Sequence, residues 1–221
     1  MTRTLGWLAV CVLSTAVLST SALPAAELTA RVSSAQGVAI ADAVVSVTPR
    51  DATAAAVHEP PQTRTIDQKD ETFIPYVEIF RPGDSVVFRN SDQTRHHVYS
   101  FAPARQFEFV LVSGQSSAPL RLDHAGVVAA GCNIHDHMIT YLYIGEATWM
   151  TRTGVGGRAT FAALAPGDYD VSVWHPRLRP GQAAMQQALH VNDASEHKEL
   201  AFTLSLLPDS RVPADRERAD Y

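Results

Sequence analysis

The chain has 221 residues, which is enough for one large or two small domains. Charged residues make up 19% of it and hydrophobic residues 46%, and the formal net charge is −5, so the composition is that of an ordinary globular protein. No run of lysine and arginine is long enough to follow a phosphate backbone, which excludes nucleic acid as the expected partner.

Residues 1–26 have the layout of a secretory signal peptide. Arg3 gives a positive start, an apolar run follows at 5–18, and small residues then lead to a cleavage site between about residues 22 and 26. The apolar run is short for a bilayer span, although an uncleaved membrane anchor is the alternative interpretation. We therefore expect export to the periplasm, with no membrane span after cleavage of the signal.

Cleavage would remove Cys11 and leave Cys132 as the only cysteine of the mature protein. No intramolecular disulfide is then possible, although an oxidising compartment would permit one. A single thiol in such a compartment is a liability unless it is buried or binds a metal. The neighbours of Cys132 are therefore the first place to look for a site.

The predicted fold class is all-β, because short β-branched runs alternate with turn residues. Residues 43–47, 85–88 and 169–174 are typical strands, and the Pro-Gly-Asp triplets at 82–84 and 166–168 are typical turns. Short strands at this spacing predict β-sandwiches or barrels.

The C-terminal third adds three expectations. The Ala/Gln-rich stretch 181–189 is interpreted as a loop or a single turn. Residues 208–221 are charged and lack apolar residues for a core, so we expect a disordered tail there. One final strand has a single buried face, since apolar residues alternate at Leu200, Phe202, Leu204 and Leu206.

Two domains are predicted from the position of the candidate ligands. Every one of them lies in residues 62–147, between the flanking segments 27–61 and 148–207. Domains whose ends lie close together can be inserted into loops of others. The family resemblance of the flanking segments, given below, implies that they form one discontinuous sandwich around an inserted domain. Three consecutive pieces of one irregular sandwich are the alternative.

The sharpest motif is Gly-Cys-Asn-Ile-His-Asp-His-Met at 131–138. Cys132, His135 and Met138 follow one another at intervals of three residues, and a turn between two strands can direct all three into one cavity. Thiolate, imidazole and thioether are ligands that copper prefers. A site of this kind still needs a second imidazole from elsewhere in the sheet.

A histidine pair in segment 82–101 can supply that imidazole. The segment has the pattern of a strand, a polar turn and a second strand that begins with His96 and His97. Successive strand residues face opposite sides, so only one of the two can point at the metal. The alternation alone leaves open which one it is.

Residues 62–147 resemble the cupredoxins, the blue-copper proteins. They contain the Gly-Asp-x-Val-x-Phe strand of that family at 83–88, and Asn90 precedes His96 by six residues. The Cys-x2-His-x2-Met loop is similar to the short loop of amicyanin. The resemblance implies a Greek-key sandwich that holds one mononuclear copper ion through His96, Cys132, His135 and Met138.

The resemblance also assigns roles to the remaining positions near the motif. His97 stands where the family usually has Asn, which implies that it helps to tie the two ligand loops together. Ala130 departs from the pattern, because an aromatic residue often lies two before the cysteine. His137 is open to two interpretations: a surface residue on the copper loop, or a replacement for Met138 as ligand.

The flanking segments resemble a second family. Residues 36–47 and 151–174 are similar to the early and later strands of the carboxypeptidase-regulatory or transthyretin-like sandwich, which gives a smaller Ig/transthyretin-like β-sandwich beside the copper domain. The chain also resembles proteins labelled as methylamine-utilisation proteins, a label that names a pathway and proves no chemistry.

The function that the resemblance implies is electron transfer between redox proteins, without enzymatic chemistry. A copper-binding or delivery protein is one alternative, although the Met- or His-rich tracts expected of it are absent from the sequence. A non-redox interaction module with a degenerate cupredoxin site is another. Structural zinc would use more Cys and His ligands, and Cys/His catalysis lacks an oxyanion-hole motif. The remaining histidines are expected to be structural, apart from a Trp174–His175 pair that could form an exposed docking spot.

Overall fold

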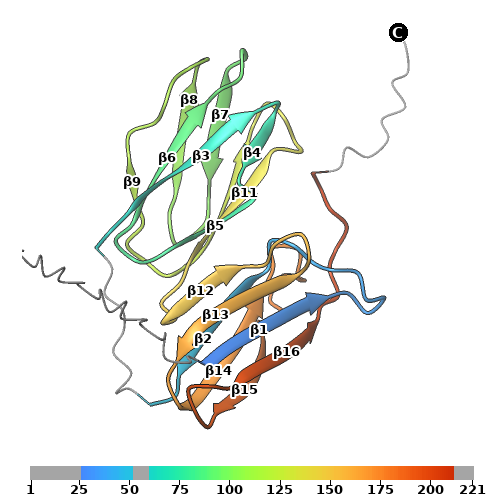
Figure 1. The fold of residues 1–221 in the computed structure, drawn as a ribbon. Coiled ribbons are helices and arrows are strands. Elements are labelled where there is room, and N and C mark those ends of the chain that lie inside the picture. The colour runs from blue at the N-terminus through green and yellow to red at the C-terminus, as the bar shows by residue number, and fades with distance from the viewer. Residues whose placement is uncertain (1–25, 52–59, 212–221) are drawn as a thin grey trace, which may run out of the picture.

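In the computed structural model, residues 26–51 and 60–211 are described, and they form sixteen strands and no helix (Figure 1). The expected all-β class is therefore confirmed. The predicted signal peptide falls almost wholly on residues 1–25, outside the described part. No helix that could cross a membrane occurs among the described residues.

Nine consecutive strands form a sandwich that we call the site sandwich (Figure 1). Its two sheets have the strand orders β5-β11-β10-β7-β8 and β4-β3-β6-β9. Large apolar side chains such as Phe80, Phe88 and Leu142 are fully buried between the sheets. The strands are β3 (Thr63–Lys69), β4 (Thr72–Ile74), β5 (Val77–Phe80), β6 (Ser85–Asn90), β7 (His96–Ser100), β8 (Phe107–Leu111), β9 (Leu120–Arg121), β10 (Gly126–Cys132) and β11 (Ile139–Ile144).

The other seven strands form the outer sandwich, and they come from both sides of the site sandwich in the sequence. Its sheets have the orders β13-β1-β16 and β12-β2-β14-β15, so the blue N-terminal strands lie among orange and red C-terminal ones (Figure 1). The strands are β1 (Ala26–Ser33), β2 (Val44–Pro49), β12 (Trp149–Arg152), β13 (Arg158–Leu164), β14 (Gly167–Trp174), β15 (Met185–Val191) and β16 (His197–Thr203).

Alternation of side chains explains the burial of β1, whereas β2 is buried on both faces. In β1 every second residue is buried, because one face of the strand meets the core and the other faces outward. In β2 the first four residues, from Val44 to Val47, are all buried. This strand pairs with β14 along Val44 to Pro49.

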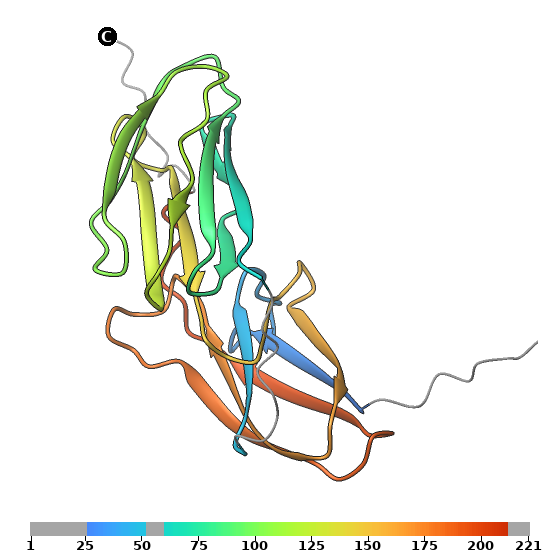
Figure 2. The same cartoon turned by 90° about the vertical axis from the view of Figure 1, so that its left-hand side faces the viewer.

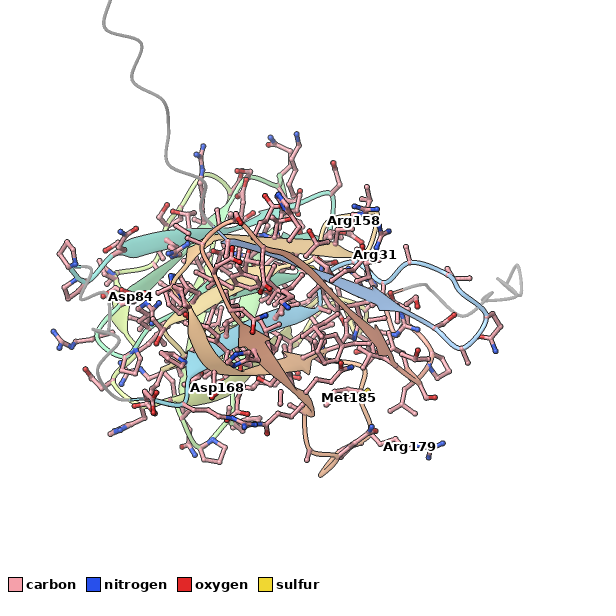
Figure 3. The ribbon with its side chains drawn as sticks, turned by 60° about the horizontal axis from the view of Figure 1, so that its bottom comes forward. Arg31, Asp84, Arg158, Asp168, Arg179 and Met185 are labelled. Atoms are coloured by element: carbon pink, nitrogen blue, oxygen red, sulfur yellow. The ribbon has the colours of Figure 1, made fainter. Side chains whose placement is uncertain are left out.

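The outer sandwich carries charged residues on its surface and none of the candidate ligands. Arg31 of β1 and Arg158 of β13 are register partners and lie side by side (Figure 3). Arg31 also forms an ion pair with Glu199 on the neighbouring strand. Exposed pairs of this kind contribute little to stability, so the outer sandwich is held mainly by its own apolar core.

A third, small apolar cluster joins the two sandwiches, which follow one another along the long axis of the molecule (Figure 2). Trp174 of β14 packs against β11, with ring centroids 5.2 Å from Tyr143 and 6.2 Å from Tyr141. Val44 and Val77 are fully buried in the same cluster. The expected docking spot at Trp174–His175 is therefore wrong, because Trp174 already packs on the neighbouring sandwich and His175 is 3% exposed.

Two further expectations for the C-terminal third are corrected. The stretch 181–189 was expected to be a loop or single turn, yet β15 begins at Met185 and pairs with β14 along its whole length. Leu189 and Val191 become buried through this pairing, and such tertiary packing decides strand formation more strongly than local propensity.

The start of the expected disordered tail is packed as well. The guanidinium carbon of Arg211 lies 3.4 Å from the centre of the Tyr76 ring, and Arg211 donates a hydrogen bond of 2.7 Å to Asp209. Asp209 also lies 3.6 Å from Arg177. A charged segment is ordered here because it meets an aromatic face and an opposite charge, which composition does not reveal. Residues 212–221 lie outside the described part.

Candidate metal centre

Three side chains that can bind metal converge at one end of the site sandwich. His96 begins β7, Cys132 ends β10, and His135 lies in the loop between β10 and β11. One ligand atom from each lies within 4.8 Å of the other two, and no other such group occurs in the described ranges. His96 and Cys132 come together because β7 and β10 are antiparallel neighbours, with Cys132 opposite Val98.

The spacing of the donor atoms fits a single metal ion between them. Cys132 Sγ lies 3.6 Å from His96 Nδ1 and 3.8 Å from His135 Nδ1. Metal bonds of about 2.0–2.1 Å to nitrogen and about 2.3 Å to sulfur, at angles of about 110–120°, would place sulfur and nitrogen about 3.6–3.8 Å apart. The two rings therefore present the correct nitrogen at the correct separation.

Burial of the three side chains is uneven. His96 is 0% exposed and Cys132 is 3% exposed, whereas the His135 side chain is 17% exposed. A buried thiolate is unfavourable unless a positive partner compensates for the water it has lost. The centre is thus enclosed within the sandwich and reaches solvent at His135.

The loop between Cys132 and Met138 is closed by its own backbone. The Cys132 N–H donates to the Met138 carbonyl at 3.2 Å, and the Met138 N–H donates to the His135 carbonyl at 3.0 Å. Met138 is 2% exposed and belongs to the same core cluster as Cys132. His137 is only half-buried, with its ring centroid 6.1 Å from that of His135. Met138 is thus enclosed in the same core as Cys132, whereas His137 is partly open to solvent.

The far side of the His96 ring is held by Asp92. His96 Nε2 lies 2.8 Å from Asp92 Oδ2, and Asp92 also accepts hydrogen bonds from the amides of Asp70 at 2.6 Å and Glu71 at 3.0 Å. Burial opposes ionisation of Asp92, but these hydrogen bonds outweigh it and keep the pKa of Asp92 below its usual range. A carboxylate on Nε2 leaves the Nδ1 lone pair free for a metal. Sequence reasoning missed Asp92, whose only signal was its position four residues before His96.

Asn90 builds the turn that delivers both Asp92 and His96. It is fully buried, and its Nδ2 donates to the carbonyls of Thr94 at 2.8 Å and Leu111 at 2.9 Å. Its Oδ1 accepts the Asp92 N–H at 2.9 Å. The six-residue spacing from Asn90 to His96 therefore has a physical cause, because the buried amide side chain hydrogen-bonds to backbone groups on several sides of the turn.

His97 points away from the centre and joins the two ligand loops, as the sequence predicted. Its carbonyl accepts the Asn133 N–H at 2.9 Å, and its Nδ1 lies 3.5 Å from Asn133 Nδ2. Its Nε2 lies 2.8 Å from Glu108 on β8. Strand alternation thus separates the two histidines, with His96 turned inward and His97 outward.

Ala130, the departure from the family pattern, is fully buried. The Tyr99 ring of the neighbouring strand lies across Gly131, on the face of the sheet opposite to the inward-facing Ala130 and Cys132. A Cβ at position 131 would meet that ring at 3.3 Å, so glycine is the residue that permits this close approach. The backbone next to the cysteine is therefore shielded from one side.

No family model matches this chain, and no curated protein sequence matches it either. Among solved structures, similarity is found to a Cu-containing nitrite reductase from Thermus scotoductus SA-01, at 22% identity and a TM-score of 0.36, covering 45% of this chain and 25% of that one. A purple cupredoxin from Nitrosopumilus maritimus matches at 16% identity and a TM-score of 0.33, covering 37% of this chain and 98% of that one.

An amicyanin from Paracoccus versutus matches at 16% identity and a TM-score of 0.35, covering 45% of this chain and 98% of that one. The chain therefore spans a quarter of the nitrite reductase and nearly all of each small cupredoxin. No family model or curated sequence supports the resemblance of the flanking segments to transthyretin-like sandwiches, or that of the chain to methylamine-utilisation proteins. The case for a metal accordingly depends on the donor set of this chain.

Proposed function

We propose that this chain binds one copper ion through His96, Cys132, His135 and Met138 and transfers single electrons between redox proteins in the periplasm. The observation that carries the proposal is the convergence of Cys132 Sγ with the Nδ1 atoms of both histidines, at 3.6 and 3.8 Å. Copper in such a ligand set changes between two oxidation states with little rearrangement.

The composition of the ligand set supports copper over zinc. Two imidazoles and one thiolate with a weak thioether are typical of mononuclear blue-copper sites. Structural zinc sites are usually closed by four Cys or His ligands, and a thioether ligand to zinc is unusual. Cys132 is the only cysteine in the described part of the chain, so a second thiolate to bridge two metal ions is not at hand.

The surrounding residues hold the donors in place and limit the access of water. Asp92 orients His96, Asn90 fixes the turn that carries both, and the closed loop from Cys132 to Met138 positions the other donors. Rigid donors reduce the reorganisation that accompanies electron transfer, because few groups have to move. The His135 side chain is partly exposed, which supports the approach of a redox partner at the surface around this residue.

Copper loading of the purified protein tests the proposal. We expect one copper per chain and an intense visible band from the thiolate–copper bond. Copper bound without such a band, or two copper ions per chain, would contradict a mononuclear site of this type. Zinc content of the purified protein identifies the main competing metal.

The outer sandwich contributes no ligand, so we propose that it attaches or orients the site sandwich. The outer sandwich is made by the segments 27–61 and 148–207, which flank residues 62–147 in the sequence. Each sandwich has its own apolar core, which supports two separable units. A fragment of residues 62–147 should then fold and bind copper, with lower stability because Tyr141, Tyr143 and Val77 lose their cover. Circular dichroism and copper titration measure this. A fragment that stays unfolded, or colourless while the full chain is coloured, would favour one continuous sandwich.

A further inference from the structure

The turn between β3 and β4 contacts His135 directly and reaches His96 only through Asp92. Its two residues, Asp70 and Glu71, have φ angles of +52° and +53°, a conformation that non-glycine residues seldom adopt. Their amides both donate to the Asp92 carboxylate, Asp70 to Oδ1 and Glu71 to Oδ2, and Oδ2 also contacts His96 Nε2. The unfavourable backbone conformation is therefore held by the same carboxylate that orients a predicted ligand.

The Glu71 side chain reaches the second histidine. Glu71 Oε1 lies 3.5 Å from His135 Nε2, the ring nitrogen that faces away from Cys132. This distance is longer than a direct hydrogen bond, and the Glu71 side chain is 52% exposed. The contact is therefore an electrostatic bias that is weaker than the 2.8 Å contact between Asp92 and His96.

We infer that Glu71 is a positioning residue for His135, holding its Nε2 proton outward so that Nδ1 faces Cys132 and a bound metal. The two rings are then arranged alike, each with a carboxylate on Nε2 and the thiol beside Nδ1. Neutral imidazole carries its proton on one nitrogen, and a carboxylate beside Nε2 favours the tautomer protonated there. The added negative charge also favours the more highly charged state of a metal.

The tautomer part of this inference stands on the protein alone, whereas its effect on potential rests on the proposed function. We therefore choose two readouts. In metal-free protein, nitrogen NMR of the histidine rings reports which nitrogen of His135 carries the proton. In copper-loaded protein, the reduction potential reports the effect of the charge.

Glu71→Gln removes the charge and keeps the size of the side chain. We expect the preference of His135 for Nε2 protonation to fall about threefold. The binding affinity for copper(II) should fall relative to that for copper(I) by up to about tenfold, which raises the reduction potential by up to about 59 mV. Glu71→Asp keeps the charge and suits a positive φ, so it should restore part of both effects.

The matched control is Asp123→Asn, which removes an exposed carboxylate of the site sandwich that pairs with Arg121 and touches neither histidine. A change beyond that of the control, restored in part by Glu71→Asp, supports the inference. A tautomer ratio and potential equal to those of the control overturn it, as does a change that Glu71→Asp fails to restore. If the unmodified protein shows no visible copper band, the proposed function fails, and the tautomer ratio still decides the role of Glu71.

Discussion

Among the described residues each sandwich buries one histidine, and the two differ in what surrounds their rings. His175 of the outer sandwich accepts the Arg177 N–H at 3.0 Å and bonds the Ala41 backbone, and burial together with the nearby Arg177 charge lowers its pKa to about 4. His96 of the site sandwich lies between the Asp92 carboxylate and the Cys132 thiol. Both are enclosed, but only the second has a ring nitrogen directed at another metal-binding atom.

The comparison shows that burial of a histidine does not by itself mark a site. A ring satisfied by backbone groups is a structural element, because its nitrogens are already used by the fold. A ring with a carboxylate on one nitrogen and a thiol at the other is prepared for a metal. The first three predictions below test that contrast, and the fourth sharpens the description of the centre itself.

The largest effect is expected from Cys132→Ser, which should abolish the intense visible band of the copper-loaded protein. The band requires a thiolate–copper bond, and a serine oxygen cannot form it. Visible absorption at equal copper loading measures the effect. His190→Ala, an exposed histidine of the outer sandwich, serves as the control and should keep the colour. Strong colour in Cys132→Ser would rule out Cys132 as the ligand that gives the band.

Next in size is the difference between two adjacent histidines. His96→Ala should lower copper affinity by at least about tenfold more than His97→Ala, because His96 is turned into the centre and His97 only joins the loops. Competitive copper titration of both variants gives the two affinities. The reverse order would mean that His97 is the ligand.

The outer-sandwich histidine should influence stability through pH rather than through metal. Its pKa is about 4 in the folded protein against 6.5 as the ordinary value, so between these limits the unfolded chain binds a proton that the folded chain does not. The free energy of unfolding should therefore fall as pH drops from 6.5 to 4, by up to about 3 kcal/mol from this residue.

Denaturant unfolding of metal-free protein at several pH values measures this dependence. His175→Gln should remove that part of the slope, while His190→Gln, which changes an exposed histidine of the same sandwich, serves as the control. An identical slope in His175→Gln and the unmodified protein would show that His175 takes up its proton in the folded state as readily as in the unfolded one.

The smallest effect concerns the fourth ligand. Met138→Leu should keep copper and colour but raise the reduction potential by roughly 60 mV, which corresponds to about a tenfold change in relative affinity for the two oxidation states. Leucine is close to methionine in volume, so the buried position should tolerate it. Voltammetry of Met138→Leu and His137→Ala compares the two candidates. A larger shift in His137→Ala would assign the axial role to His137, and loss of copper from Met138→Leu would make Met138 a stronger ligand than we propose.

Much of the fold could be predicted because its signals are local. β-branched residues favour strands, so runs such as 43–47 and 169–174 indicated strands without knowledge of their partners. The prediction of a loop at 181–189 was wrong for the opposite reason. This stretch has weak strand propensity, and pairing with β14 makes part of it a strand. The packed segment 208–211 escaped prediction because its partners Tyr76 and Arg177 lie far from it in the sequence.

The sequence by itself determined which residue types could form a centre and which loop would carry them. Cys132, His135 and Met138 occupy one short loop between β10 and β11. The spacing from Asn90 to His96 follows from the size of a different turn, the one between β6 and β7. Both patterns lie within a few residues, where backbone geometry leaves little choice.

Only the tertiary structure decided which group lies beside the outer nitrogen of His135. Asp92 meets His96 within one local turn, whereas Glu71 meets His135 because β3 pairs in parallel with β6, with Gln68 opposite Asn90, which sets the turn after β3 beside the turn after β6. The register between two strands is set by the packing of the whole sandwich, and spacing along the chain contains no record of it. Glu71 is visible in the sequence, but its closeness to the imidazole of His135 exists only in the folded molecule.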